Sequence, residues 1–288
     1  MLKNKYDFVY LFDVTNGNPN GDPDTGSDNL PRTDPETGTG FVTDVCLKRK
    51  VRDYVDLVKG GEPGYNILIK NDKPLNDHFR AAYEAEGLPV DKTRKGTNAE
   101  AEWKAQQYMC RNYFDVRAFG AVMSTGDNSC GIVRGPVQFS FADSISPVSI
   151  NRVAITRQAK TDQTRAEKGT TEMGSKSVIP YALYRMNGHI SAAQANKFTD
   201  LSEADIELLW QALLGMFDED RSAARGEMSV RGLYVFKHDN LLGNARFTEL
   251  SQKIQITEKD GIIAPRSFSD YDVTVDTSMP DGVTLIQY

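Results

Sequence analysis

The chain has few of the residues from which metal centres and nucleophilic active sites are usually built. Its 288 residues include only three cysteines and three histidines. They are Cys46, Cys110 and Cys130, and His78, His189 and His238. The cysteines are odd in number and lack the paired spacing of a metal site, which indicates reduced, buried thiols in a cytoplasm. The histidines belong to no Cys/His or Ser/His signature, so we expect them at the surface or at strand ends.

Long apolar runs and nucleotide-binding motifs are also missing. The longest early apolar run, "FVYLF" (Phe8–Phe12), lies between Asp7 and Asp13 and is far too short to span a membrane. No small-residue cleavage site follows it, which argues against a signal peptide. The sequence contains neither a Walker A motif nor a G-x-G-x-x-G motif. We therefore predict no cofactor and no membrane partner.

Positive charge is scarce overall, because the chain carries a formal net charge of −6. One segment is an exception, and it begins with "TDVCLKRKVRDYV" (Thr43–Val55). Between Val45 and Lys59, five basic residues face only two acidic ones. The acidic total argues against a general nucleic-acid coat, but it permits one local basic groove.

The basic segment is predicted to be an amphipathic helix. Thr43 and Asp44 are good N-caps, and neither Pro nor Gly follows until Gly60. At about 100° per residue, one apolar stripe contains Leu47, Val51, Tyr54, Val55 and Val58. The basic side chains beside this stripe are Lys48, Arg52 and Lys59, with Arg49 a little further round. Two interpretations stay open: a solvated basic face, or an edge that binds an anionic backbone.

The rest of the chain alternates between strand and helix patterns. The predicted strands are Tyr6–Val14, Asp115–Ser124, Arg134–Ser144, Val178–Ser191 and Leu233–His238. In Arg134–Ser144, Val137, Phe139 and Phe141 alternate with polar residues, which predicts one buried face. The clearest helix is Ser202–Phe217, with an N-cap pattern close to a capping box. Residues 60–112 are predicted to be an insertion, with a strand-like Tyr65–Lys70 and helices at Asp77–Glu86 and Ala99–Asn112.

The order of the strong elements predicts the fold class. It reads strand, helix, strand, strand, helix, strand, which is the ferredoxin-like arrangement of RNA-recognition folds and belongs to the α+β class. Residues 157–177 interrupt this order with the least apolar stretch of the chain, which cannot bury enough surface to fold alone.

Four segments in this order resemble one family. They are "NPNGDPD" leading to "FVTDVCLKRKVRDYV", "DVRAFGAVMS", "TTEMGSKSVIPYALYRMNGHIS" and "RSAARGEMSVRGLYVF". Together they resemble the backbone subunit of the type I CRISPR surveillance complex Cascade, of the RAMP superfamily, most closely subtype I-C. The resemblance implies a single domain over residues 1–288, made of a palm with a modified RNA-recognition fold, a helical finger and a β-hairpin thumb. The palm would comprise residues 1–59, 113–156 and 178–288, the finger 60–112 and the thumb 157–177.

The resemblance also implies a function without catalysis. Several copies would stack head to tail along one CRISPR RNA and hold its spacer for pairing with target DNA. The other expected partners are the guide-handle-binding, large and small subunits of Cascade, in a prokaryotic cytoplasm. The residues that match the family's RNA contacts are Thr43, Lys48, Arg49, Arg52, Lys160, Met173, Lys176, Arg221, Arg225 and Arg231. The loop with the last three arginines is less glycine-rich than the family pattern.

Two other functions would depend on different features of the chain. Type III relatives of the family cut target RNA with an aspartate after the first strand, and this chain has Asp22, Asp24, Asp28 and Asp34 there. No His or Lys partner accompanies them, and "DPDTGSDN" fails the calcium-loop pattern at Ser27 and Thr33. Turn formation is the simpler explanation of these residues. A self-assembling structural protein without nucleic acid would leave the basic edge unexplained.

Overall fold

The computed structural model describes residues 1–24, 26, 28–90, 98–124, 128–157 and 172–288. Its centre is an antiparallel sheet in the order β11–β8–β1–β7–β5–β2, with β6 paired to β7 beside this path. The strands are β1 (Tyr6–Gly17), β2 (Thr39–Val42), β5 (Val137–Pro147), β6 (Asn151–Arg157), β7 (Glu172–Ile190), β8 (Glu227–His238) and β11 (Val283–Gln287).

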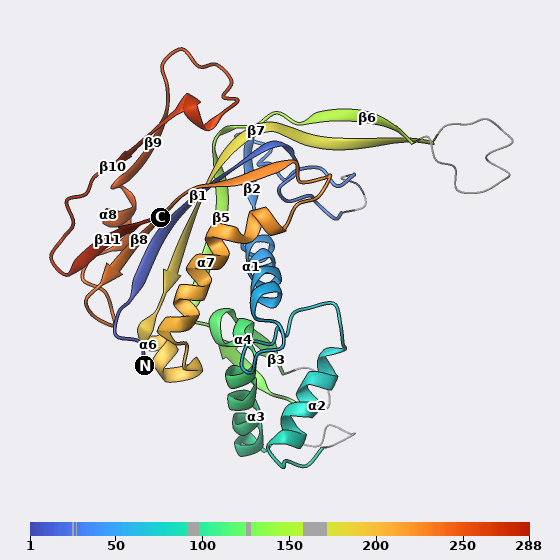
Figure 1. Ribbon diagram of the computed structural model, residues 1–288, viewed down its shortest axis with the longest axis vertical. Helices are drawn as coiled ribbons and strands as arrows, with labels where there is room; N and C mark the ends of the chain where they lie inside the picture. The colour runs from blue at the N-terminus through green and yellow to red at the C-terminus, as the bar shows by residue number, and fades with distance from the viewer. Residues whose placement is uncertain (25, 27, 91–97, 125–127, 158–171) are drawn as a thin grey trace, which may run out of the picture.

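Two helices, α1 (Asp44–Lys59) and α7 (Glu203–Glu219), cover one face of this sheet side by side (Figure 1). The main core lies between them and the sheet, and it includes Phe8, Tyr10 and Phe12 of β1. The inner strand order β8–β1–β7–β5, with α1 after β1 and α7 after β7, is that of two interleaved βαβ units. The predicted ferredoxin-like α+β fold is therefore confirmed. The capping box expected at Ser202 and Asp205 is also present.

The opposite face of the sheet is covered by the last part of the chain, for which the sequence analysis predicted no element. This part contains α8 (Phe247–Ser251), β9 (Ile254–Glu258), a short 3-10 helix η2 (Phe268–Asp270) and β10 (Tyr271–Val275). Leu250, Ile254 and Tyr271 pack with Val9 and Leu11 of β1 in a second buried cluster. RNA-recognition domains stack bases on aromatic side chains of this sheet face. Here the chain's own C-terminal segment occupies it.

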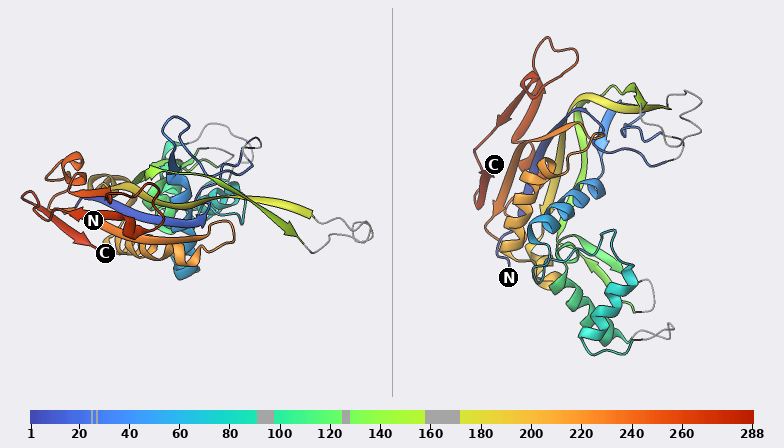
Figure 2. Two further views of the ribbon diagram at one scale, coloured as in Figure 1. Left: turned by 90° about the horizontal axis from the view of Figure 1, so that it is seen from above. Right: turned by 45° about the vertical axis from the view of Figure 1, so that its right-hand side comes forward.

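A small unit with its own core lies at the end of α1 (Figures 1 and 2). It joins the described residues of the predicted insertion, 60–112, with described residues of 113–134, which the resemblance had assigned to the palm. It contains α2 (Leu75–Ala85), α3 (Ala99–Asn112), α4 (Phe114–Phe119), β3 (Gly120–Met123) and β4 (Gly131–Arg134). The two predicted helices are confirmed. Two strand predictions are wrong: Tyr65–Lys70 is irregular, and Asp115–Ser124 begins within α4 and only then continues as β3. Short apolar runs of this kind fit a buried helix turn as well as a strand.

The predicted alternation of buried and exposed side chains in β5 ends at a bulge after Phe139. Val137 and Phe139 are buried as expected, but Phe141 is 49% exposed. The pairing of β5 with β7 changes register between Phe139 and Ala142. Because a one-residue shift moves later side chains to the other face, Ala142 takes the buried position and Phe141 faces solvent.

β7 connects the palm to a projecting hairpin. Its first residues pair with β6, from Arg157 opposite Glu172 to Asn151 opposite Val178. From Ile179 onward the same strand pairs with β1 and then β5. The hairpin arms leave the body of the molecule and point away from it (Figures 1 and 2). After β7 the chain passes through α6 (Ala192–Gln194) and a π-helical turn, η1 (Ala195–Thr199), into α7.

Two buried ion pairs attach the insertion to the palm. Arg52 of α1 donates from Nε to the Asp115 carboxylate at 2.8 Å, and Asp115 also accepts the backbone N–H groups of Leu68 and Ile69. Arg117 donates to both carboxylate oxygens of Asp205, at 3.0 and 2.7 Å.

None of the helices in the described ranges is long and apolar enough to cross a bilayer.

Replacing Arg117 with Ala is expected to lower the free energy of unfolding by about 3–5 kcal/mol, because it leaves the Asp205 carboxylate buried without its cation. Denaturant unfolding measures the change. Arg221→Ala is the matched control, since the Arg221–Asp218 pair is exposed and should contribute less than about 1 kcal/mol. Equal losses of stability in the two variants would contradict a structural role for the Arg117–Asp205 pair.

Candidate nucleic-acid interface

Four segments that are far apart in the sequence meet at the first turns of α1. They are residues 17–20 after β1, 43–50 at the start of α1, 174–177 at the base of the hairpin, and 220–226 between α7 and β8. Asn18 donates its backbone N–H to the carbonyl of Ala224 at 2.8 Å. Lys176 Nζ donates to the carbonyl of Ala223 at 2.9 Å. We call the meeting point of these segments the junction.

Two glycines allow the loops of the junction to approach each other. A Cβ on Gly17 would lie 1.8 Å from the carbonyl oxygen of Arg225, closer than any real contact. Gly226 has a φ of +63°, and a Cβ there would lie 2.4 Å from the carbonyl oxygen of Thr15. Only residues without a Cβ fit here without moving the backbone.

A carboxylate at the end of α7 organises the cations of the junction. Asp220 pairs with Lys50 of α1 and, at 2.5 Å, with Arg225. The Lys50 side chain is only 2% exposed, so it is a structural cation. Nearby, burial raises the pKa of the Cys46 thiol, and the positive charge of Lys50 only partly offsets that effect. The ion pairs of Asp220 with Lys50 and Arg225 fix α1 to the loop at 220–226.

The three predicted basic side chains of α1 lie in three different environments. Arg49 points to solvent with 63% of its side chain exposed, and it pairs with Asp53 at 3.3 Å. Lys48 is 12% exposed, pairs with Asp44, and lies over the rings of Phe119 and Phe139 on the side away from Lys50. Arg52 is directed inward to its buried carboxylate partner. Only one of these three predicted residues is thus open to a large ligand.

Thr43 is the N-cap of α1, as its sequence position indicated. Its hydroxyl accepts the backbone N–H of Cys46 at 3.3 Å and donates to Asn20 Oδ1 at 2.9 Å. Asn20 also accepts the backbone N–H of Thr43. The side chain thereby fixes the loop after β1 to the start of α1.

At the hairpin base, β6 adds a cation that the sequence analysis did not select. Arg152 is 62% exposed, donates to Ser175 and pairs with Asp28 at 2.8 Å. No strand had been predicted at β6, so the sequence did not indicate that Arg152 lies beside the strand that carries Lys176. The short run "NRVAIT", which contains β-branched residues, was the pattern that could have indicated a strand there. Predicted Lys160 lies outside the described residues, and only the backbone of Met173, opposite Thr156, is described.

The three arginines predicted between α7 and β8 do not lie together. Arg221 is exposed and pairs with Asp218, whereas Arg225 is half-buried against Asp220. Arg231 belongs to the other face of the sheet. There it donates to Asp13 at 2.7 Å and lies over the Phe268 ring.

The acidic loop after β1 has the geometry of a turn. Asp28 and its neighbour Asn29 both have positive φ, a conformation that Asp and Asn tolerate well. Asp22 lies 3.3 Å from Arg32, and Asp34 accepts the backbone N–H of Glu36. Within the described ranges, no three His, Cys, Asp or Glu side chains gather in a possible metal site.

The family model described as CRISPR-associated protein Cas7 matches residues 4–276. This chain belongs to the Cas7 family. The family named from the sequence is thereby confirmed, while the assignment to subtype I-C remains a prediction.

A relative and two solved structures show the extent of the similarity. The CRISPR-associated protein Cas7 of Haloferax volcanii is 28% identical over 237 residues, which cover 73% of this chain but only 64% of that relative. A chain described as "CRISPR RNA-guided surveillance complex, pre-nicking" aligns with a TM-score of 0.53 and 12% identity, over 85% of this chain and 81% of its own length. Another CRISPR RNA-guided surveillance complex chain gives a TM-score of 0.51 and 12% identity, over 90% and 78%. At this identity the two structures show a shared fold.

Replacing Gly17 with Ala is expected to cost about 1–3 kcal/mol of stability, because the new methyl group must displace the backbone at Arg225. Thermal unfolding measures the change. Gly174→Ala is the control, because its Cβ would have no neighbour closer than 4.0 Å. A Gly17→Ala protein as stable as the control would show that the loops are not in close contact.

Proposed function

We propose that this chain is a non-catalytic backbone subunit that binds CRISPR RNA along the junction. Copies would stack head to tail on the guide and present its spacer to target DNA, together with the other Cascade subunits in a prokaryotic cytoplasm. Membership of the Cas7 family supports this assignment. The observation that carries it is that the cation-bearing segments of α1, β6, β7 and the 220–226 loop meet at the junction, where Arg49, Arg152 and Arg221 are exposed and Lys176 is half-buried.

The kind of contact follows from which surfaces are open. The sheet face that stacks bases in RNA-recognition domains is covered by α8, β9 and β10. Arg49, Arg152, Lys176 and Arg221 are instead available as hydrogen-bond donors to phosphate oxygens. A protein that holds any guide sequence needs this arrangement, because phosphate contacts position an RNA without reading its bases.

The carboxylates beside these cations do not prevent RNA binding. Arg49, Arg152 and Arg221 each form an ion pair in which both side chains are at least half exposed. Such pairs contribute only about 0–1 kcal/mol, so an arginine can exchange its carboxylate for a phosphate at little cost. The buried pairs of Lys50 and Arg52 cannot exchange in this way. We therefore assign Arg52, and Arg231 with its partner Asp13, to holding the protein fold.

Replacing Arg49, Lys176 and Arg221 together with Ala is expected to weaken binding to single-stranded RNA and to reduce its dependence on salt. Because the variant cannot neutralise three of the phosphates, the slope of log K against log salt should fall by about 2. Titrations at several salt concentrations measure the slope.

A matched control removes three cations that lie far from the junction on exposed or half-exposed side chains. The triple variant of Arg80, Lys104 and Lys259 to Ala loses the same charge and should keep the slope within about 0.5. If both triple variants change the slope equally, RNA responds to total charge and the junction is not its site. Arg52→Ala should mainly lower stability.

The proposal also predicts no cleavage of bound nucleic acid. Incubation of the protein with a guide and complementary RNA or DNA, in Mg²⁺ or Mn²⁺, should leave every strand intact on a denaturing gel. The assay includes the Asp22→Ala and Asp24→Ala variants. A metal-dependent cut that either substitution abolishes would establish the ribonuclease function instead.

A further inference from the structure

A cavity of about 350 Å³ remains between the sheet and the C-terminal elements that cover it. Its walls come from β5 and β7 on the side of the sheet, and from β9, β10 and the loop between them on the other side. They include Ser146, Tyr181, Glu258, Ile263, Arg266 and Tyr271. The cavity therefore lies on the face of the sheet opposite α1 and α7, outside the junction.

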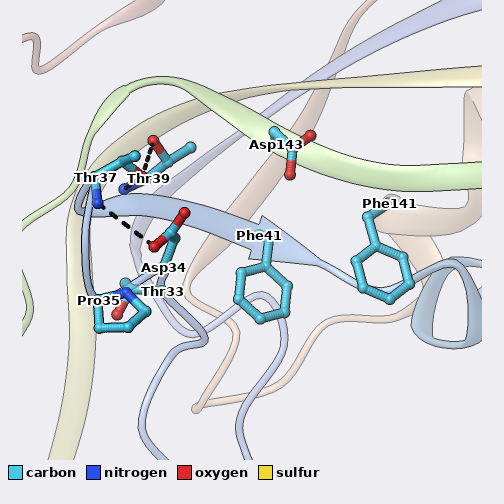
Figure 3. A pocket seen from close by; sticks show the side chains of 8 residues that line it. All are labelled: Thr33, Asp34, Pro35, Thr37, Thr39, Phe41, Phe141 and Asp143. Atoms are coloured by element: carbon cyan, nitrogen blue, oxygen red, sulfur yellow. Dashed lines mark hydrogen bonds between the residues drawn. The ribbon is translucent and has the colours of Figure 1, made fainter.

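A larger pocket, of about 700 Å³, has a different chemistry (Figure 3). It lies where β2 and β5 meet, and its charged side chains are the carboxylates of Asp34 and Asp143. No basic side chain lines it, so it repels an anion. The cavity under the C-terminal elements combines a carboxylate with a guanidinium instead. It therefore suits a ligand that carries both an anionic group and hydrogen-bond donors.

Two buried hydroxyl groups hold the carboxylate of the cavity in place. The Ser146 hydroxyl is hydrogen-bonded to Glu258 Oε1 and to the hydroxyl of Tyr271, which lies 2.8 Å away. Because a carboxylate only accepts hydrogen bonds, Ser146 donates to Glu258 and Tyr271 donates to Ser146. Burial raises the pKa of Tyr271, which keeps this donor protonated. Glu258 Oε2 makes no hydrogen bond within the described part of the chain, so it is free to accept one from a ligand.

The cation of the cavity is available as well. Arg266 donates from Nη1 to the carbonyl of Pro265 at 2.9 Å, and its side chain has no ion-pair partner among the described residues. Its Nε and Nη2 atoms, which share one edge of the guanidinium, make no hydrogen bond to those residues either. Such an edge carries two parallel donors, the arrangement that binds a phosphate in bidentate form.

These groups together match a ribonucleotide. Arg266 suits the phosphate, and a carboxylate such as Glu258 is the acceptor that nucleotide-binding folds use for a ribose hydroxyl. The rings of Tyr181 and Tyr271, with centroids 6.5 Å apart, provide an aromatic wall for the base. Ile263 is 98% exposed beside the cavity, and a bound base would cover it.

The size of the cavity limits the ligand to one nucleotide. Small-molecule sites have volumes of about 300–1,000 Å³, and this cavity is near the lower end of that range. A strand of RNA needs an open groove, whereas α8, β9 and β10 cover the sheet here. An amino acid also carries an anion and hydrogen-bond donors, but most amino acids lack the flat ring that an aromatic wall selects.

We propose that the cavity binds a single ribonucleotide, with Arg266 on the phosphate, Glu258 on the ribose hydroxyls, and Tyr181 and Tyr271 beside the base. The ligand joins the sheet to the C-terminal elements, because its contacts come from β7 on one side and from β9, β10 and their loop on the other. The site needs neither a guide nor a second copy, so the inference goes beyond the proposed function and is independent of it.

Calorimetric titration of nucleic-acid-free protein with AMP, GMP, CMP and UMP tests the proposal. At least one of the four should bind with a Kd below about 1 mM. Removal of its phosphate or of its 2′-hydroxyl should weaken binding at least about tenfold, because each group meets a charged partner.

Variants assign the two contacts. Glu258→Ala should remove the preference for ribose over deoxyribose, and Arg266→Ala should remove the preference for the phosphorylated ligand. Glu249→Ala and Arg246→Ala are the matched controls, because both residues are exposed and neither lines the cavity. The nucleotide should raise the Tm of the wild type and of both controls, and this scan also checks that every variant is folded.

A variant of the junction separates this site from guide binding. The triple replacement of Arg49, Lys176 and Arg221 with Ala should bind the mononucleotide within about twofold of the wild type, because distant sites act independently.

Four results would each overturn the inference. They are the absence of binding by all four nucleotides at millimolar concentration, equal losses in the control variants, loss of binding in the junction variant, and tighter binding of an amino acid than of any nucleotide. None of them bears on the proposed function, which the salt dependence of RNA binding tests separately.

Discussion

The continuity of β7 determines where almost every functional surface of this protein lies. Its 19 residues form one strand, so the hairpin is an extension of the central sheet and has no linker of its own. The register that pairs Ile179 with Gly17 in the palm therefore also fixes the position of Lys176, which reaches the 220–226 loop. Because Gly17 packs against Arg225 in that loop, the base of the hairpin, the end of β1 and the start of β8 form one rigid assembly. A ligand held at the junction thus contacts elements of the sheet and not independent loops.

Buried and exposed ion pairs perform different tasks here. Arg52 and Arg117 hold the insertion against α1 and α7 through carboxylates that are almost fully buried. Breaking such a pair leaves an uncompensated charge, so the arrangement is fixed once the protein has folded. Arg49, Arg152 and Arg221 pair with exposed carboxylates, and these interactions are weak enough to be exchanged. The environment of each arginine, and not its presence in a basic segment, decides whether it can bind an external anion.

This distinction also explains what could be predicted from the sequence. Periodicity and capping residues located β1, α1, α3 and α7, because each is long or strongly marked. The pattern could not show that Arg52 turns inward, since its partner Asp115 is 63 residues further along the chain. It also missed the bulge that exposes Phe141, because alternation assumes an unbroken register. The C-terminal elements α8, β9 and β10, which cover the sheet, have no strong local sequence pattern. Which of their residues are buried depends on the strands of the sheet against which they pack.

The negative net charge is compatible with nucleic-acid binding because it is distributed around the cations. Each exposed arginine of the junction already has a carboxylate partner, so the free protein presents no large uncompensated positive surface. A passing polyanion must displace those carboxylates one at a time, and each exchange alone gains little. Under the proposed function, a guide that spans all four segments would make several exchanges at once and release several counterions, which would make binding favourable. The same charge balance would limit binding of short or incorrectly placed RNA, and so would favour a strand that follows the whole junction.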